Sequence, residues 1–308
     1  MRKFDVIVVG DYYLDVIFSD LSQFPELGKE IFSAGFDMIP GGAFNSAVAM
    51  HRLGLRVGWA ADFGADDFSR FTVERARAEG LDDALFVFHR QPLRRITVSI
   101  SYPHDRAFIT YCDPEPAIPA AMKALASASA RAAYLPGFYH GPFLNAGVIA
   151  ARARRMKLIM DGNSSSNENL ADPSVRRAIQ SVDVFMPNAD EARRFTSEND
   201  VERALRVLAG LCPLVVIKDG PRGAFAWAEG RVIHSPAIPV EPLDTTGAGD
   251  CFNAGFVAAW LEGQPLEDCL KWGNIVGGLS TLARGGAGRS VTRRDVAQWL
   301  DTLRSNGY

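Results

Sequence analysis

The stretch Leu243-Asp244-Thr245-Thr246-Gly247-Ala248-Gly249-Asp250 stands directly before an amphipathic run at residues 251–261. Small residues ahead of a helix leave backbone N–H groups unobstructed, and the positive end of the helix dipole adds to their field. A phosphate group fits such a site. Asp250 then lies in the first turn, where a carboxylate beside a phosphate deprotonates or orients an attacking hydroxyl. An equally weighted alternative is a helix capped by Thr246, with Asp250 as a favourable first-turn acid.

Around this stretch, short β-rich apolar runs alternate with longer segments of helical period. The expected strands are 6–9, 57–61, 133–135, 158–160, 184–186, 214–217 and 224–227, and the expected helices are 44–53, 68–79, 144–154, 175–181, 201–211, 247–261, 266–282 and 293–303. This alternation predicts an α/β fold, in which helices cover both faces of a mostly parallel central sheet.

Two segments interrupt the alternation. The first holds strand-like pieces at 16–18 and 31–36, and the second pairs 96–101 with 107–111 as a β-hairpin around a turn at 102–106. We expect residues 15–39 and 91–112 to form a small β-sheet lid. Residues 1–14, 40–90 and 113–308 are expected to form the α/β domain.

Composition excludes several classes of protein. Lys+Arg number 33 and Asp+Glu 36, a net charge of −3, so we expect no nucleic-acid partner. No apolar run approaches the roughly 20 residues of a membrane-spanning helix, and the first ten residues do not match a signal peptide. We therefore expect a cytoplasmic protein without a membrane partner. Its four cysteines lack CxxC spacing and are expected to be reduced and mostly buried.

Two further motifs suit ligands. Gly41-Gly42 lets a ligand approach the backbone, and Asn45 behind it suits a polyhydroxylated molecule, although a tight turn capped by Asn45 is the more common outcome. Asn188 and Glu191 follow a strand, where they either form an ordinary capping box or meet Mg²⁺ through waters.

Three other positions follow expected strands. Lys218, Gly220 and Gly223 lie in a strand, glycine turn and second strand that either shape a nucleotide floor or only form a hairpin. His140 and Asp161 follow strand ends, where ligands of parallel sheets bind, and each is equally well a structural residue.

Four motifs occur in one order along the chain: Gly41-Gly42-x-x-Asn45, Asn188-x-x-Glu191, Lys218-x-Gly220-x-x-Gly223 and Asp244-Thr245-Thr246-Gly247-Ala248-Gly249-Asp250. Together they resemble the ribokinase-type (pfkB) family of carbohydrate kinases, from Val6 to about Trp299. The resemblance implies a three-layer ribokinase-like fold with a β-sheet lid. It also implies transfer of the γ-phosphoryl of Mg-ATP to a hydroxymethyl group.

Site roles follow from the resemblance position by position. Asp250 matches the catalytic base, and the N–H groups of Gly247, Ala248 and Gly249 match the anion hole. The residues implied along ATP are Asn188, Lys218, Gly220, Gly223, Gly247, Gly249 and Asn274, while Glu191 orders Mg²⁺ through water.

The acceptor side follows in the same way. Asp15 matches the sugar-binding aspartate, with Gly41, Gly42 and Asn45 around the same ligand. Tyr13 replaces a small polar residue of ribokinases, which argues against ribose, and its ring suits stacking on a sugar or a base. Asp11 is either a helper or a structural turn residue.

Many members of this family bind a monovalent cation such as K⁺. The resemblance assigns it to Asp244 and Thr246, with Arg284, Gly286 and Ser290 from the loop 281–290. In the family the lid often pairs across a homodimer, and the apolar strands expected at 31–36 and 96–100 leave edges that such pairing covers.

The leading hypothesis is an ATP- and Mg²⁺-dependent kinase acting on a primary alcohol of a small sugar or sugar acid. One alternative is a nucleoside kinase with an aromatic pocket drawn from Tyr12, Tyr13, Phe36, Phe44 and Phe138. Another acceptor is a phosphorylated sugar held by Arg94, Arg95 and Arg106. A non-catalytic nucleotide- or sugar-responsive protein is disfavoured by the intact Asp250, and an oxidoreductase by the lack of GxGxxG after the first strand.

Overall fold

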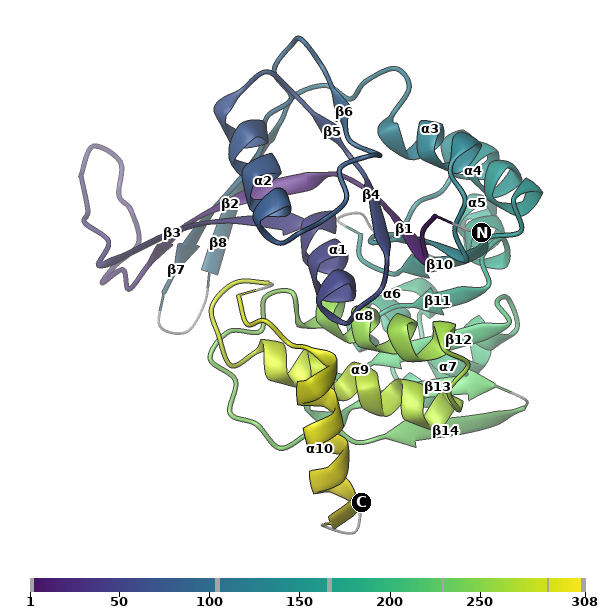
Figure 1. Cartoon of the computed structure of the whole chain (residues 1–308). Helices are drawn as coiled ribbons and strands as arrows, with labels where there is room; N and C mark the ends of the chain where they lie inside the picture. Colours follow the sequence, from purple (N-terminus) through teal and green to yellow (C-terminus); the bar gives the residue numbers. More distant parts are fainter. Residues whose placement is uncertain (1–2, 103–105, 165–167, 229, 287, 306–308) are drawn as a thin grey trace.

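A sheet of 8 strands forms the centre of the fold, in the order β14-β13-β12-β11-β10-β9-β1-β4 (Figure 1). The computed structural model describes residues 3–102, 106–164, 168–228, 230–286 and 288–305. The strands are β1 (Val6–Val9), β4 (Val57–Ala60), β9 (Ala132–Leu135), β10 (Lys157–Asp161), β11 (Val184–Met186), β12 (Leu214–Lys218), β13 (Ala224–Ala228) and β14 (Arg231–Ser235). Neighbours from β4 to β12 are parallel, and β13 and β14 add an antiparallel edge. The predicted α/β fold is confirmed.

Helices cover both faces of this sheet. One face packs against α1 (Ala43–Arg52), α8 (Ala248–Leu261) and α9 (Leu266–Ser280), and the other against α3 (Ala120–Ser127), α4 (Pro142–Ala153), α5 (Pro173–Gln180), α6 (Ala189–Thr196) and α7 (Val201–Ala209). Strand β1 is apolar throughout because it is buried on both faces. Val6 and Val8 pack into the core on the side of α1, α8 and α9, and Ile7 packs into the core on the opposite side. Two more helices, α2 (Asp67–Ala78) and α10 (Arg293–Ser305), pack against the first layer.

A second, 4-stranded sheet projects from one side of the molecule (Figure 1). Its order is β3-β2-β7-β8, with β2 (Tyr12–Ser19), β3 (Gly35–Gly42), β7 (Arg95–Ser101) and β8 (Arg106–Cys112). The predicted hairpin is β7 and β8, and its turn at 103–105 lies outside the described residues. Strand β2 pairs in parallel with β7, which joins the two interrupting segments in one sheet as expected.

The strand predicted at residues 31–36 is wrong. Strand β3 begins at Gly35 and extends to Gly42, because β2 pairs with its whole length from Tyr12↔Gly42 to Ser19↔Gly35. Cross-strand hydrogen bonds therefore hold Gly41 and Gly42 in a strand, although their residue types favour a turn. Helix α1 starts at Ala43 without a side-chain cap, so Asn45 is not its cap.

Four elements were not predicted from the sequence. They are β14, α3 and the short parallel pair of β5 (Asp62–Phe63) and β6 (Val87–Phe88). Each is too short or too irregular to show a clear period. Cys112 is exposed and Cys212, Cys251 and Cys269 are buried, all as free thiols, in line with the prediction. Among the described helices, none combines the length and apolar character needed to cross a bilayer.

Candidate active site

A cavity of about 780 Å³ opens where β10, β11 and β12 end, facing the N-terminus of α8. Its lining joins Asp161, Asn163, Asn188, Glu191, Lys218, Gly220 and Gly223 from the strand side to Gly247, Ala248, Gly249 and Asp250 from the helix. The remaining wall includes Ile238, Pro239, Val240, Phe252, Asn274, Gly277 and Gly278. The lining thus combines polar and charged groups with apolar ones, as a nucleotide requires.

The N-terminus of α8 is built for close approach. Gly247 is the N-cap with φ 68°, and no side chain caps the helix. Thr246 is therefore not the cap: its hydroxyl donates to Asp244 Oδ1 at 2.7 Å. A Cβ at Gly249 would lie 3.8 Å from Lys218 Nζ, so the lysine and the helix start face the same space. Uncapped N–H groups, the helix dipole and a cation together form an anion site.

Asp250 lies at the junction of the cavity and α1. Its Oδ1 accepts a 2.8 Å hydrogen bond from the hydroxyl of Ser46. Burial raises the pKa of Asp250 to about 6, and the charge of Asp161 raises it further against the hydrogen bond from Ser46 and the charge of Lys218. A carboxylate with this pKa is ionised at neutral pH and has a higher proton affinity than an exposed one.

A buried polar network supports the cavity floor. Lys218 Nζ lies 2.8 Å from Asp161 Oδ1 and 3.3 Å from Asn253 Oδ1. The Asn253 amide donates to Asp161 Oδ2 at 2.6 Å and to the Tyr134 hydroxyl at 2.8 Å. Sequence reasoning missed Asn253, Tyr134 and Ser46, although Asn253 follows Asp250 by one helical turn and so shares its face of α8.

Asn188 and Glu191 form the predicted capping box at the start of α6. The Asn188 side chain accepts from the Glu191 N–H at 2.8 Å and Glu191 Oε2 accepts from the Asn188 N–H at 2.7 Å, a complete capping box. Both residues also line the cavity. Burial raises the pKa of Glu191, and the charge of Lys218 opposes this shift.

The strand–turn–strand motif forms the predicted hairpin, and its glycines lie at the cavity. A short 3₁₀ turn at Gly220–Arg222 joins the antiparallel strands β12 and β13, and Gly220 and Gly223 line the cavity. A Cβ at Gly223, whose φ is 87°, would fall on the Ser235 carbonyl. Asn274 Nδ2 donates to Ser235 O at 2.9 Å and to Pro236 O at 3.0 Å, and so anchors the chain that leads into the cavity wall.

Most residues expected around the acceptor, Asp15, Gly41, Gly42 and Asn45 among them, are not part of the cavity lining. A Cβ at Gly41 would lie 2.5 Å from Asp15 Oδ2, so the Asp15 carboxylate occupies space that a side chain at position 41 would need. Burial raises the pKa of Asp15 to about 6. Asn45 hydrogen-bonds Asp250, and its buried Oδ1 has no hydrogen-bond partner among the described atoms. Of the predicted set, Asp15 thus lies against Gly41, and Asn45 contacts Asp250.

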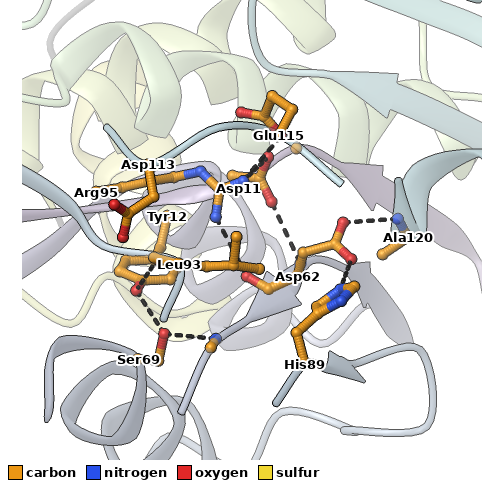
Figure 2. Close-up of polar contacts among 12 residues, drawn as sticks. Asp11, Tyr12, Asp62, Ser69, His89, Leu93, Arg95, Asp113, Glu115 and Ala120 are labelled. Carbon is orange, nitrogen blue, oxygen red and sulfur yellow. Dashed lines mark hydrogen bonds and ion pairs between the residues drawn. The ribbon is translucent and has the colours of Figure 1, made fainter. Parts of the chain in front are cut away.

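Asp11 is tied into the structure where the two sheets meet. Its Oδ2 lies 3.1 Å from Arg95 Nη2, and its Oδ1 accepts from the Asp62 N–H at 3.2 Å (Figure 2). Its backbone carbonyl accepts from the Ala43 N–H at the start of α1. These contacts fit the structural reading of Asp11.

Several other predicted residues lie away from the cavity. Tyr12 is fully buried and donates to Leu93 O, and Phe44 and Phe138 are buried, so these three rings belong to the core. Tyr13 remains 37% exposed. His140 Nδ1 lies 3.2 Å from the Ser174 hydroxyl, and His140 is not among the residues that line the cavity.

The glycine-rich loop at residues 281–290 packs against Asp244 and Gly247. Asp244 Oδ2 accepts from the Gly285 N–H at 2.9 Å, and the Gly286 carbonyl accepts from the Cys251 thiol at 3.2 Å. The Arg284 side chain instead reaches Ser19 of the small sheet, Ser290 is exposed, and residue 287 lies outside the described residues.

Comparisons with known proteins agree with this geometry. The chain is 25% identical to the ribokinase of Bacillus subtilis over 96% of this chain and 99% of that protein. It is 28% identical to the nucleoside kinase of Methanothermobacter thermautotrophicus over 96% of each. The Arabidopsis thaliana ribokinase solved with ribose and ATP superposes with a TM-score of 0.82 at 22% identity, covering 97% of this chain and 99% of that one. The model of the pfkB family carbohydrate kinases matches residues 3–293, and the chain belongs to this family.

Proposed function

We propose that the protein transfers the γ-phosphoryl group of Mg-ATP to a primary hydroxyl of a small sugar or sugar acid. The observation that carries this proposal is Asp250, a carboxylate of raised pKa in the first turn of an uncapped helix. On one side it lines the cavity, and on the other it meets Asn45 and Ser46. A base between a phosphate site and a hydroxyl site is the arrangement that phosphoryl transfer needs.

In this mechanism Asp250 accepts the hydroxyl proton as the oxygen attacks the γ-phosphorus. The bond from the γ-phosphorus to the β,γ-bridging oxygen breaks, and ADP leaves. The N–H groups at Gly247, Ala248 and Gly249 stabilise the negative charge on the transferred group, and Lys218 adds a positive charge beside them. The unpartnered Oδ1 of Asn45 accepts a hydrogen bond from the acceptor and orients it. Asp15, with Gly41 and Gly42, binds two adjacent hydroxyls of the same molecule.

The cavity residues fit a divalent cation held mainly by the nucleotide. The cavity lining contains three carboxylates, those of Asp161, Glu191 and Asp250, and one cation, Lys218. Its polar residues therefore carry an excess of negative charge. No cluster of three or more metal-ligating side chains occurs in the described part of the chain. Mg²⁺ on the phosphates would therefore be met by Asn188 and Glu191 through water. When bound, Mg²⁺ neutralises charge on the transferred phosphoryl group.

We further propose that K⁺ supports the anion site from the loop side. Asp244 and Thr246 would hold it with backbone oxygens at Arg284 and Gly286 and the nearby Ser290. The small sheet would act as a lid over the acceptor, and its exposed Phe18, Phe36 and Phe108 would meet a second copy in a homodimer. We propose a cytoplasmic location for the protein, because the proposed reaction consumes ATP.

A nucleoside is the second candidate for the acceptor. Tyr13 and Tyr139 are 37% and 42% exposed. Burial, and after it the nearby charges of Asp11 and Tyr13, raise the pKa of Tyr139, which indicates that both phenols lie close to Asp11. Two accessible aromatic rings that lie near the same carboxylate suit stacking on a nucleobase. The Methanothermobacter thermautotrophicus relative is a nucleoside kinase, which supports this alternative.

The proposal predicts acceptor-dependent ADP release from Mg-ATP. The assay uses ketoses, aldoses, sugar acids, phosphosugars and nucleosides, each with and without K⁺. We expect one class of acceptor to give strong turnover that K⁺ increases. If every acceptor is inactive while ATP still binds, the protein is a nucleotide-binding sensor with a kinase fold.

Gly41→Ala should weaken acceptor binding specifically. The new Cβ would lie 2.5 Å from Asp15 Oδ2, so the carboxylate must shift away from the acceptor hydroxyls. We expect KM for the acceptor to rise about 10-fold or more, the equivalent of one charge-assisted hydrogen bond. KM for ATP serves as the internal control, because neither Gly41 nor Asp15 lines the cavity. Equal KM values for the acceptor in the variant and the wild type would contradict the role of Asp15.

A further inference from the structure

Tyr134 is a phenol on β9 that lies near two acidic groups, Asp161 and Asp250. Its side chain is fully buried, in the core shared with α1 and α8. Its oxygen accepts a 2.8 Å hydrogen bond from the Asn253 amide, and Ser46 is its second hydrogen-bond partner. Burial, and after it the charges of Asp161 and Asp250, hold the pKa of Tyr134 well above its usual range. The phenol therefore keeps its proton at neutral pH.

The charged groups at one end of this network fix the orientation of the Asn253 amide. Asn253 Oδ1 lies 3.3 Å from Lys218 Nζ, and an ammonium group donates hydrogen bonds but accepts none. Asn253 Nδ2 lies 2.6 Å from Asp161 Oδ2, which belongs to the carboxylate paired with Lys218 and accepts. A reversed amide would lose both bonds. The second hydrogen of Nδ2 is therefore the one that Tyr134 accepts.

The remaining hydrogens follow in the same direction. Because the Tyr134 oxygen accepts from Asn253, its own hydrogen is left to donate to Ser46. The Ser46 hydroxyl donates its hydrogen to Asp250 Oδ1 at 2.8 Å, so its lone pairs are left for Tyr134. These three groups form a directed chain of hydrogen bonds that ends on the carboxylate. Consecutive hydrogen bonds of this kind strengthen one another, and a bond donated to a carboxylate favours its ionised form.

The surroundings of Asp250 leave this chain as a direct source of stabilisation. The titratable and charged groups nearest to it are Asp161 from β10, Lys218 from β12, Tyr134 from β9 and Cys251 from α8. Lys218 is paired with Asp161 at 2.8 Å, so its charge is shared. Burial raises the pKa of Cys251 to about 12, so this thiol is neutral. Asn253, Tyr134 and Ser46 are each 0% exposed, so bulk water does not compete for their hydrogen bonds.

We infer that Tyr134 is a positioning residue of the reaction, which acts through Ser46 to hold Asp250 with Oδ2 toward the acceptor hydroxyl. The inference rests on the proposed function and deepens it. Tyr134 does not line the cavity, so its effect on turnover passes through the chain. Ser46 occupies Oδ1, and Oδ2 is the oxygen that takes the proton of the attacking hydroxyl. The fixed direction of each hydrogen keeps the carboxylate from rotating away.

Tyr134→Phe removes the phenolic hydroxyl and keeps the ring. At pH 8, where Asp250 is ionised in both proteins, we expect kcat to fall about 10-fold because the carboxylate is less well oriented. Loss of a bond that favours the ionised form also raises the pKa of Asp250. The decline of kcat/KM toward acid should therefore begin about half a pH unit higher than in the wild type. KM for ATP should not change.

Tyr12→Phe is the matched control. Tyr12 is also a fully buried phenol, and its hydroxyl bonds to Ser69 Oγ at 2.8 Å and Leu93 O at 3.0 Å. Its loss should lower the melting temperature, as that of Tyr134 does, but leave kcat and the pH profile at their wild-type values. Ser46→Ala breaks the next link of the chain. In that background Tyr134→Phe should cause no further loss of kcat, because the chain is already interrupted.

Titration of Asp250 separates this inference from the proposed function. Carbon NMR of protein labelled at the aspartate carboxyl carbons measures the titration midpoint without an acceptor, and Asp250→Asn identifies the resonance. In Tyr134→Phe the midpoint should rise by about half a pH unit even if nothing is phosphorylated, a result that would overturn only the proposed kinase reaction. An unchanged midpoint, or an effect of Tyr134→Phe on kcat that is equally large with and without Ser46, would overturn the inference.

Discussion

Asp250→Asn is expected to lower kcat by about 10³-fold, within the range that follows loss of a general base. The amide has nearly the same shape and keeps an oxygen that can accept from Ser46, which now lies 2.8 Å from Oδ1. It cannot accept the hydroxyl proton. The Kd for ATP, measured by titration calorimetry, should remain close to that of the wild type. Steady-state ADP release measures kcat.

The pH dependence of the wild type provides a second readout. Because the pKa of Asp250 is raised to about 6, its carboxylate is ionised above this pH, and kcat/KM should fall about tenfold per pH unit below it. The same shift predicts stability. The folded state holds the Asp250 proton more tightly than the unfolded state, whose pKa is near the ordinary 3.8. The ionised carboxylate therefore destabilises the fold above pH 6, and this cost disappears as the pH falls toward 4.

Asp250→Asn should consequently raise the melting temperature at pH 8 and have little effect near pH 4. Asp268→Asn is the matched control, because Asp268 is an acid in the first turn of the neighbouring helix α9 and is 44% exposed. It should change neither turnover nor the pH profile. Substantial residual turnover in Asp250→Asn would refute its role as the base.

Gly247→Ala is expected to damage both stability and turnover. The φ of Gly247 is 68°, which costs an L-residue about 1 kcal/mol or more. The added Cβ would also fall on the Gly286 backbone, 2.7 Å from its carbonyl oxygen. Gly286 cannot retreat freely, because Asn45 packs against its other side. Overpacking of this kind adds about 1–3 kcal/mol, so the free energy of unfolding should fall by about 3 kcal/mol in total.

Gly263→Ala separates the two causes of this loss. Gly263 also has a positive φ of 78°, but a Cβ there would meet no atom within 4 Å. Urea unfolding should therefore show a loss of only about 1 kcal/mol for Gly263→Ala, with kcat unchanged. Equal losses in the two variants would show that the contact between Gly247 and Gly286 contributes nothing.

The parts of the fold that the sequence predicts are those governed by local pattern. Buried parallel strands such as β1 are short apolar runs, and helices such as α8 follow glycine-rich stretches, so both are visible in the residues themselves. Strand β3 shows the limit of this approach. Its proline and two glycines predict a turn. Only the pairing with β2, whose residues lie 16 to 30 positions earlier in the chain, makes them a strand.

In the candidate site, too, local sequence predicts some features and not others. The position of Asp250 beside a helix start depends on consecutive residues, and the motif predicts it. Asn253 contacts Tyr134 and Asp161, which lie 119 and 92 positions away, and no local spacing indicates these contacts. The assignment of Thr246 as a cap failed because Gly247 takes a left-handed conformation, which shortens the helix by one residue and turns Thr246 toward Asp244.

The parallel pairing of β2 with β7 bears on the order in which the chain folds. Leu14 pairs with Ile96, and between them lie α1, β4 and α2, which belong to the main body. Closing so long a loop is entropically costly unless the intervening elements have already folded. The small sheet should therefore assemble late, on a preformed body, and open before global unfolding. Hydrogen exchange should then find the β2–β7 amides among the earliest to exchange, while those of β1 and β9 persist until the whole chain unfolds.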